Sequence, residues 1–376
     1  MPKPAPAFDP NKVEYTHQLG GIQTGTIDYP QPNGGQSCRV ALVNTGGGLT
    51  FTVALDRGGD IVEAAYLGQS LAYLTPNGYK PPSHAYHRGE EWLAAWPGGL
   101  VTTCGPLHIG APPEDAGGDD PSRSLHGHFS NTPAAVESII NPDPRAKRFE
   151  MRLDLVIRCT RMFGPSVEIR RTIACKLGEP TIELRDRVTN LSDFAVPHHW
   201  LYHVNLGYPL LDEGAQLIYG GDYDWHWDTA QPPGDAPRPE TFGKFKRVPA
   251  LIKAHAQNGQ RGLIVVPRTT RGQITCGLIN RKLGLGFEMS YPAKQLPRLA
   301  NWQNFGPRGC YVTGLEPFHG SLQWDGGDTH PAAKSKLRPG QTASYDLTFR
   351  ALGQKSQLDA LRQHDAPLTE QGKTRA

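Results

Sequence analysis

A strict period of two in residues 148–157 is the feature that most limits what this chain can fold into. Successive side chains of an extended strand point to opposite faces, so such alternation predicts a strand with one face in a core and the other in water. Charged residues separate most of the apolar ones, which are Phe149, Met151, Leu153, Leu155 and Ile157.

The same alternation recurs in residues 167–173 and 181–188. Gly164-Pro165 and Gly178-Glu-Pro180 separate these runs, and both are typical turn sequences. Parallel strands would need long crossover connections, so three strands joined by short turns predict an antiparallel meander.

Other short runs rich in β-branched and apolar residues extend this pattern along the chain. A hairpin is predicted from residues 39–44 and 49–55 around a Gly46-Gly-Gly48 turn. Residues 356–362 alone show helical periodicity. Surface loops are predicted at 110–124 and 229–243. Further strands are predicted at 262–266, 273–279, 286–290 and 343–350.

The composition favours one large all-β domain, an antiparallel β-sandwich. The 376 residues include 43 Gly and 34 Pro, spread along the chain as many tight turns require. We expect a loose arm at 1–14, a single domain at 15–352, and a short helix with a polar tail at 353–376. A net charge of +3 without a dense basic block argues against nucleic-acid and membrane partners.

The cysteines and the amino terminus suggest a reducing compartment. Residues 1–10 are proline-rich and contain no apolar run, so a cytoplasmic location is expected. No Cys-x-x-Cys spacing occurs, and structural thiols are favoured over a metal cluster. The cysteines are Cys38, Cys104, Cys159, Cys175, Cys276 and Cys310.

Four segments contain polar residues that strands and turns do not require: 84–105, 125–134, 198–212 and 311–319. The first combines Arg88 and Trp96 with other aromatic residues. Aromatic rings stack on sugars while Arg and His donate to hydroxyl groups, so it could form a sugar-binding wall. Ordinary burial in the core explains its tryptophans equally well.

The other segments supply candidate acids and bases. In 198–212, His203 and Asn205 share one face of a predicted strand, which could present them to a cleft or leave them on an exposed surface. Glu316 precedes Pro317 and is expected at a strand end, where partial desolvation would raise its pKa and suit it to act as a base; a solvated rim carboxylate is the alternative. The pair His126 and His128 could belong to a turn or bind a metal.

The chain resembles the galactose mutarotase superfamily, and most specifically an uncharacterised branch of mutarotase-like bacterial proteins, over residues 40–350. The motifs that carry the resemblance are Trp96-Pro-Gly-Gly-Leu-Val-Thr-Thr-Cys-Gly105, His126-Gly-His-Phe-Ser-Asn-Thr-Pro-Ala134, His203-Val-Asn-Leu-Gly-Tyr-Pro-Leu-Leu-Asp-Glu-Gly214 and Gly314-Leu-Glu-Pro317.

The resemblance implies a mutarotase-like supersandwich and a cofactor-free aldose 1-epimerase. It assigns His203 as general acid, Glu316 as general base and His126 as a ligand of sugar hydroxyls. These three residues should then line one cleft. The other residues predicted to contact a small-molecule sugar are Arg88, Trp96, His128, Asn131, Asn205 and Trp302. A monomer or homodimer is expected.

Two departures from the family keep other functions open. The Arg that usually follows the His-Gly pair is replaced by His128-Phe-Ser-Asn131, and the family's sugar-binding Asp has no secure counterpart. An isomerase or lyase acting on an oxidised or acidic sugar is one alternative, with a metal held among His126, His128, His203 and a carboxylate. A sugar-binding module without turnover is the other.

Overall fold

The structure is a computed structural model, and it describes residues 8–29, 36–112, 124–229, 245–257, 259–322 and 328–370. Most of the loops predicted at 110–124 and 229–243 lies outside these ranges, as do parts of the predicted arm and tail.

Three antiparallel sheets make up most of the described chain, with one parallel pair, β14 with β22. The eight-stranded sheet has the spatial order β13 (Gln216–Ile218), β16 (Gln273–Asn280), β17 (Leu285–Pro292), β21 (Thr342–Leu352), β10 (Thr181–Asn190), β9 (Ser166–Lys176), β8 (Glu150–Thr160) and β7 (Ala134–Ile140). The seven-stranded sheet has the order β22 (Leu368–Glu370), β14 (Gly221–Asp228), β15 (Arg261–Pro267), β18 (Arg298–Phe305), β19 (Tyr311–His319), β12 (Trp200–Gly207) and β6 (Thr102–Cys104).

Smaller elements complete the described fold. A five-stranded sheet contains β1 (Gly21–Tyr29), β2 (Gln36–Asn44), β3 (Leu49–Ala54), β4 (Asp60–Tyr66) and β5 (Gln69–Ser70). Strands β11 (Val196–Pro197) and β20 (Lys336–Leu337) form a separate pair. The α-helices that lie wholly within the described ranges are α1 (Trp92–Ala95) and α3 (Lys355–Arg362), and α3 matches the predicted helix.

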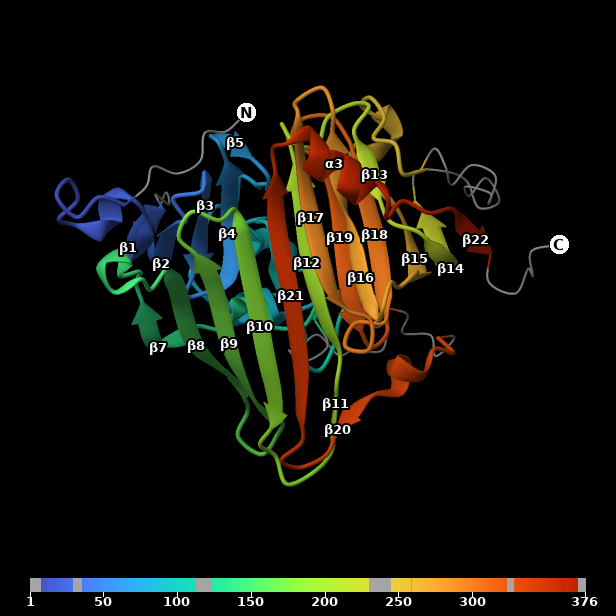
Figure 1. The fold of residues 1–376 in the computed structure, drawn as a ribbon. Coiled ribbons are helices and arrows are strands. Elements are labelled where there is room, and N and C mark those ends of the chain that lie inside the picture. The colour runs from blue at the N-terminus through green and yellow to red at the C-terminus, as the bar shows by residue number, and fades with distance from the viewer. Residues whose placement is uncertain are drawn as a thin grey trace.

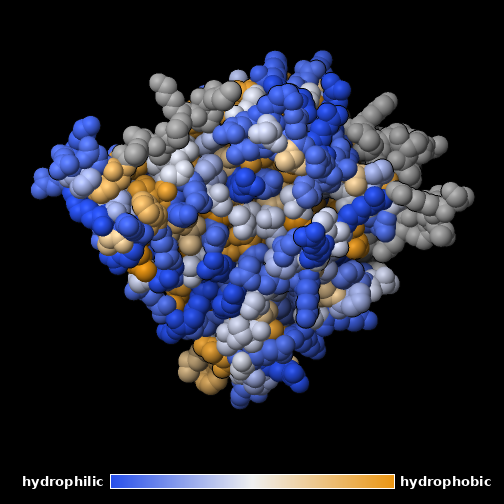
Figure 2. Space-filling view, viewed as in Figure 1, coloured by the Kyte–Doolittle hydropathy of each residue, from blue (hydrophilic) through white to orange (hydrophobic). Residues whose placement is uncertain are grey.

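The two large sheets pack face to face, which confirms the predicted β-sandwich (Figure 1). One continuous core joins Leu155 of β8 and Leu347 of β21 to Tyr202 of β12 and Leu315 of β19. The predicted meander is β8, β9 and β10, in consecutive antiparallel pairs. Its outward side chains form cross-strand ion pairs such as Arg158–Glu168, and this face of the molecule is mainly hydrophilic (Figure 2).

The middle of the seven-stranded sheet is covered on both faces. Every residue of β12 is buried, and all but the two end residues of β19 are buried. The expectation that Glu316 lies at a strand end is therefore wrong, because β19 continues through Pro317 to His319. Proline lacks an N–H donor, and the ladder between β19 and β12 is interrupted opposite it, at Tyr202 and His203.

None of the helices in the described ranges is both long and apolar enough to cross a membrane.

A fully buried ionic network ties the sheets together behind β12. Arg171 on β9 donates to both carboxylate oxygens of Asp186 on β10, at 2.9 and 2.7 Å, and to Asp60 at 3.1 Å. It also donates to Thr103 of β6 at 2.7 Å, and the Tyr202 hydroxyl donates to Asp186 at 2.6 Å. Burial raises the pKa of Asp60 to about 6 against the opposing charge of Arg171.

Removing one partner of this network should be far more costly than removing a surface charge. We expect Arg171→Leu to lower the free energy of unfolding by about 3–5 kcal/mol, because two buried carboxylates lose their cation. The neighbouring Arg170→Leu is the control, since the exposed Arg170 side chain pairs with Glu137 and Glu168 at the surface, where an ion pair is worth less than about 1 kcal/mol. Urea unfolding compares the two variants, and equal losses would contradict this account.

Candidate functional site

A cavity of about 410 Å³ lies against the face of the seven-stranded sheet that points away from the main core. Strands β12, β18 and β19 contribute His203, Trp302 and Glu316 to it, and the turn before the β7 region contributes His126. The cavity therefore brings together residues from all four polar segments that the sequence singled out, including Trp96 from the first.

His203 and Glu316 face each other across the gap in the ladder between β12 and β19. Leu201 pairs with Phe318 and Val204 with Leu315, so the register sets His203 opposite Glu316. The distance from His203 Nε2 to Glu316 Oε1 is 3.3 Å, without hydrogen-bond geometry. Both side chains are buried. Glu316 Oε1 has no hydrogen-bond partner among the described residues, which marks a place where a polar ligand is expected.

Burial shifts both members of the pair toward their uncharged forms. It lowers the pKa of His203 to about 4, opposed by the nearby Asn205 side chain, and raises the pKa of Glu316 to about 8. The pair therefore holds one proton between these values, and that proton can be exchanged with a ligand. Strongly shifted acids and bases in a cavity are typical of functional sites.

His126 is the third ionisable side chain next to the pair. Its ring centroid lies 5.4 Å from that of His203. It occupies a turn with a φ of 58°, and its Nδ1 accepts a hydrogen bond of 3.2 Å from Gly110 N–H. This bond favours the neutral tautomer with its proton on Nε2, so Nε2 is the atom able to donate to a hydroxyl group. Burial and the neighbouring His203 lower the pKa of His126 well below its usual range.

Aromatic rings surround the pair. The ring centroids of Trp96 and Trp302 each lie 5.5 Å from that of His203, and Trp92 stacks on Trp96 at 5.3 Å. The sequence left two roles open for the tryptophans near residue 96, a core or a binding wall. Trp92 and Trp96 are buried in a small apolar cluster and also line the cavity, so their positions are compatible with both roles.

Gly314 leaves the space that the Glu316 side chain occupies. The two residues lie on the same face of β19, and a methyl group on Gly314 would overlap Glu316 Oε1 and approach its Cδ to 3.0 Å. Any larger residue would push the carboxylate away from His203. This close approach explains why the Gly314-Leu-Glu-Pro317 motif begins with a glycine.

Four other residues predicted to bind a sugar do not line this cavity. Arg88 is exposed, and His128 is half-buried. Asn131 is buried and its amide donates to the Ser83 carbonyl at 2.7 Å. Asn205 lies behind His203, where its amide donates to the Gly99 carbonyl at 3.1 Å and to the His203 carbonyl at 2.8 Å. Asn205 is thus placed to orient the histidine.

Several lining residues had no signal in the sequence. Tyr73, Trp227, Gln257, Gln260 and Asn304 all reach the cavity, yet each belongs to a segment without an unusual polar pattern. Only the pairing of β14, β15 and β18 beside β19 brings most of them to the site.

Within the described ranges, no group of three or more His, Cys, Asp or Glu side chains is arranged to hold a metal ion. His126, His203 and Glu316 meet at the cavity, whereas His128 does not line it.

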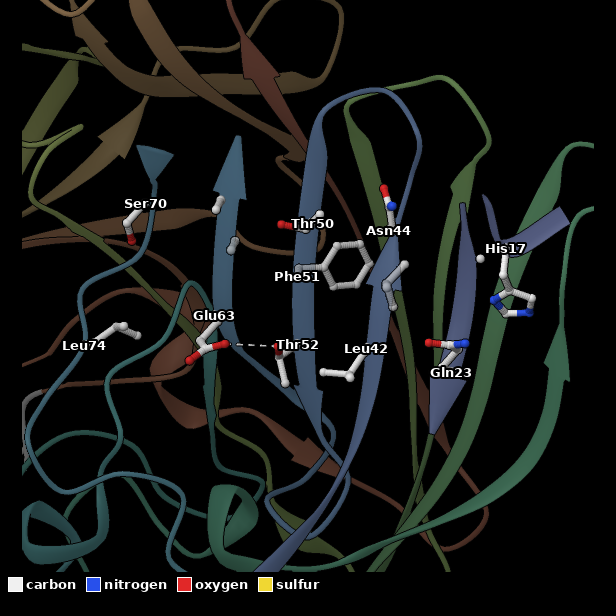
Figure 3. Close-up of a pocket in the computed structure, with 14 residues that line it drawn as sticks. His17, Gln23, Leu42, Asn44, Thr50, Phe51, Thr52, Glu63, Ser70 and Leu74 are labelled. Carbon is white, nitrogen blue, oxygen red and sulfur yellow. Dashed lines mark hydrogen bonds between the residues drawn. The ribbon is translucent and has the colours of Figure 1, made fainter. Parts of the chain in front are cut away.

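A second hollow, of about 440 Å³, lies over the five-stranded sheet (Figure 3). Gln23, Asn44, Thr52 and Glu63 line it, and Thr52 donates to Glu63 at 3.1 Å. It contains none of the predicted site residues and no paired acid and base like His203 and Glu316. We therefore place the functional site in the cavity of His203 and Glu316.

Residues 35–351 match the family described as "Domain of unknown function (DUF4432)". The chain belongs to this family. A comparison with curated proteins gives no match.

Solved structures similar to this one share its fold. A candidate aldose 1-epimerase of Klebsiella pneumoniae superposes with a TM-score of 0.76 at 19% identity, over 94% of each chain. A galactose mutarotase-like protein of Clostridium acetobutylicum gives a TM-score of 0.59 at 12% identity, covering 89% of this chain and 99% of the other. A galactose 1-epimerase of Lactobacillus acidophilus gives 0.54 at 12% identity, over 89% and 100%. The fold is therefore galactose mutarotase-like, as the resemblance implied.

The raised pKa of Glu316 makes a prediction about stability and pH. Between pH 4.5 and about 8 the folded protein holds a proton on Glu316 that the unfolded chain releases. The contribution of Glu316 to the free energy of unfolding therefore falls as the pH rises through this range. His203 has the opposite effect, because its pKa is lower in the folded protein than in the unfolded chain. Its contribution to the free energy of unfolding rises with pH and reaches its full value above about pH 6.5. We expect stability to fall by about 1–2 kcal/mol from pH 6.5 to 8. In Glu316→Gln this loss should disappear. Urea unfolding at both pH values measures it, and a parent protein of constant stability would refute the shift.

A second prediction concerns Gly314. In Gly314→Ala the added methyl group should displace the Glu316 carboxylate, lengthen its distance from His203 Nε2 and reduce the stability loss between pH 6.5 and 8. Gly25→Ala on β1 is the control, since nothing lies within 4 Å of a methyl group placed there. Crystal structures of the two variants measure the distance. An unchanged 3.3 Å contact in Gly314→Ala would contradict the role given to the glycine.

Proposed function

We propose that this protein is an aldose 1-epimerase, which interconverts the anomers of a free sugar bound between His203, Glu316 and His126. The observation that carries this proposal is the cross-strand contact of His203 and Glu316, 3.3 Å apart, in an aromatic cavity. Anomer interconversion needs one proton donor and one proton acceptor on a single sugar ring, and this pair supplies them.

The protons balance over one cycle. When the pair carries its proton on His203, Glu316 is the base and His203 the acid. Glu316 takes the proton of the anomeric hydroxyl while His203 Nε2 gives its proton to the ring oxygen. The bond from C1 to the ring oxygen breaks and an aldehyde forms at C1. After rotation about C1–C2, the same transfers run backward and close the ring from the other face.

The opposing pKa shifts support this use of the pair. Ring opening leaves Glu316 protonated and His203 neutral, which is the form of the pair that burial favours. The ionised form needed to start the reaction is higher in energy, and hydrogen bonds from sugar hydroxyls to Glu316 would lower that energy. His126, with its proton on Nε2, is suited to hold one of these hydroxyls.

No observation favours the two alternatives over epimerisation. A carboxylate on an acidic sugar needs a cationic partner, and the described residues that line the cavity include no Lys or Arg. A binding module has no need of an acid and a base in contact on facing strands. We also propose a cytoplasmic location.

Replacing the proposed base should separate turnover from binding. Glu316→Gln keeps the size of the side chain but cannot accept a proton, so the rate of anomer interconversion should fall at least about a hundredfold while sugar binding persists. His203→Asn should behave likewise, and the double variant should lose little more, because both residues act in one step. His126→Ala should weaken binding instead.

The measurement is the change of optical rotation of freshly dissolved aldoses, compared with affinity from calorimetry. Arg88→Ala, whose side chain is exposed outside the cavity, is the control and should match the parent. Parent-like rates in Glu316→Gln would show that the base is wrongly assigned. A parent protein that equilibrates no aldose would refute the proposed function.

A further inference from the structure

The tryptophans around the reactive pair present hydrocarbon to a ligand. The polar atom of an indole is its N–H, and in three of these rings that group is bound to the protein. Trp92 Nε1 donates to Ser130 Oγ at 3.0 Å, Trp96 Nε1 donates to Thr102 Oγ1 at 3.0 Å, and Trp302 Nε1 donates to Gln260 Oε1. These rings therefore have no donor left for a sugar hydroxyl.

The same rings lie where the reaction takes place. Trp96 and Trp302 flank His203, and their own ring centroids are 6.2 Å apart. Val312 and Leu125 pack against this cluster and also line the cavity. A hydroxyl group pressed against these indole rings, Val312 and Leu125 would lose its water without gaining a partner from them, which is unfavourable.

The described lining also offers nothing to a negative charge. It has no Lys or Arg, and its carboxylates are Glu90 and Glu316. The lining histidines are the buried His203 and the half-buried His126, and their lowered pKa values keep both neutral at neutral pH. A bound carboxylate, sulfate or phosphate group would be desolvated without a cation.

We infer that the site is selective for an uncharged deoxy sugar, in which a methyl group replaces the hydroxymethyl group on C5. This inference rests on the proposed function, because that reaction fixes which part of the sugar meets the wall. Glu316 and His203 must reach the anomeric hydroxyl and the ring oxygen. C5 is bonded to the ring oxygen, so its substituent lies within two bonds of the atom that His203 addresses, beside Trp96 and Trp302.

The remaining hydroxyl groups have partners elsewhere in the cavity. His126 can donate through Nε2. Asn304 and Gln257 also line the cavity; Asn304 Oδ1 accepts from Gly306 N at 2.9 Å, so the amide N–H₂ is the group with which Asn304 can donate to a hydroxyl. The cavity therefore combines a polar part that can bind hydroxyl groups with an apolar part beside His203 and Glu316.

Three sugars that differ only at C5 test the inference: D-fucose with a methyl group, D-galactose with a hydroxymethyl group and D-galacturonate with a carboxylate. L-rhamnose and L-mannose form a second matched pair. Calorimetry with Glu316→Gln measures binding without turnover. We expect each deoxy sugar to bind about tenfold more tightly than its hydroxymethyl counterpart, a difference of about 1.4 kcal/mol. D-galacturonate should bind most weakly.

Substitutions at Val312 locate the source of the preference. Val312→Thr adds a hydroxyl group to the wall at nearly constant volume, so the preference for the deoxy sugar should shrink several-fold. Val312→Ala is the control for lost volume and should keep the preference. If either variant fails to fold, the sugar comparison in the parent protein still decides the matter.

The inference and the proposed function fail in different ways. Equal or tighter binding of D-galactose or D-galacturonate would overturn the inference, even if the parent protein equilibrates their anomers rapidly. Tighter binding of the deoxy sugars without any equilibration by the parent would overturn the proposed function and leave the selectivity of the cavity supported.

Discussion

Much of the structure depends on one buried cation, Arg171. Its guanidinium joins two strands of the eight-stranded sheet to Asp60 and, through Thr103, to the edge of the seven-stranded sheet. Tyr202 completes the network from β12. Tyr202 and His203 are adjacent in β12 and point to opposite faces. The network therefore fixes β12 on the face opposite to the one from which His203 points into the cavity. A buried charge network with all partners in place favours one arrangement of its strands.

The chemistry of the site follows from the same burial. A histidine and a glutamate in contact would form an ion pair in water, but here desolvation favours the neutral forms of both. Gly314 allows the carboxylate to lie against the strand, and Asn205 holds the strand beneath the histidine. The result is a pair that can give one proton and take another, with aromatic rings excluding water around it.

The sequence predicted more strands of the eight-stranded sheet than of the seven-stranded sheet, for a physical reason. β8, β9 and β10 face water on one side, so their alternation is visible in the sequence. β18 is covered on both faces and has no alternation to detect, and it was not predicted. The sequence predicts Glu316 at a strand end because a proline, here Pro317, usually ends a strand. In the structure β19 continues, because Pro317, which has no N–H, lies opposite a gap in the ladder with β12. The motifs pointed to His126, His203 and Glu316, but Trp227 and Gln260 reach the cavity only through strand pairing.

The central claim is that one sugar ring sits between Glu316 and His203. A crystal structure of Glu316→Gln with a bound aldose tests it most directly, because the variant should bind the sugar without turning it over. The account predicts the anomeric oxygen within hydrogen-bond distance of residue 316 and the ring oxygen within that distance of His203 Nε2. A sugar bound with both oxygens away from these side chains, or only in the hollow over the five-stranded sheet, would contradict it.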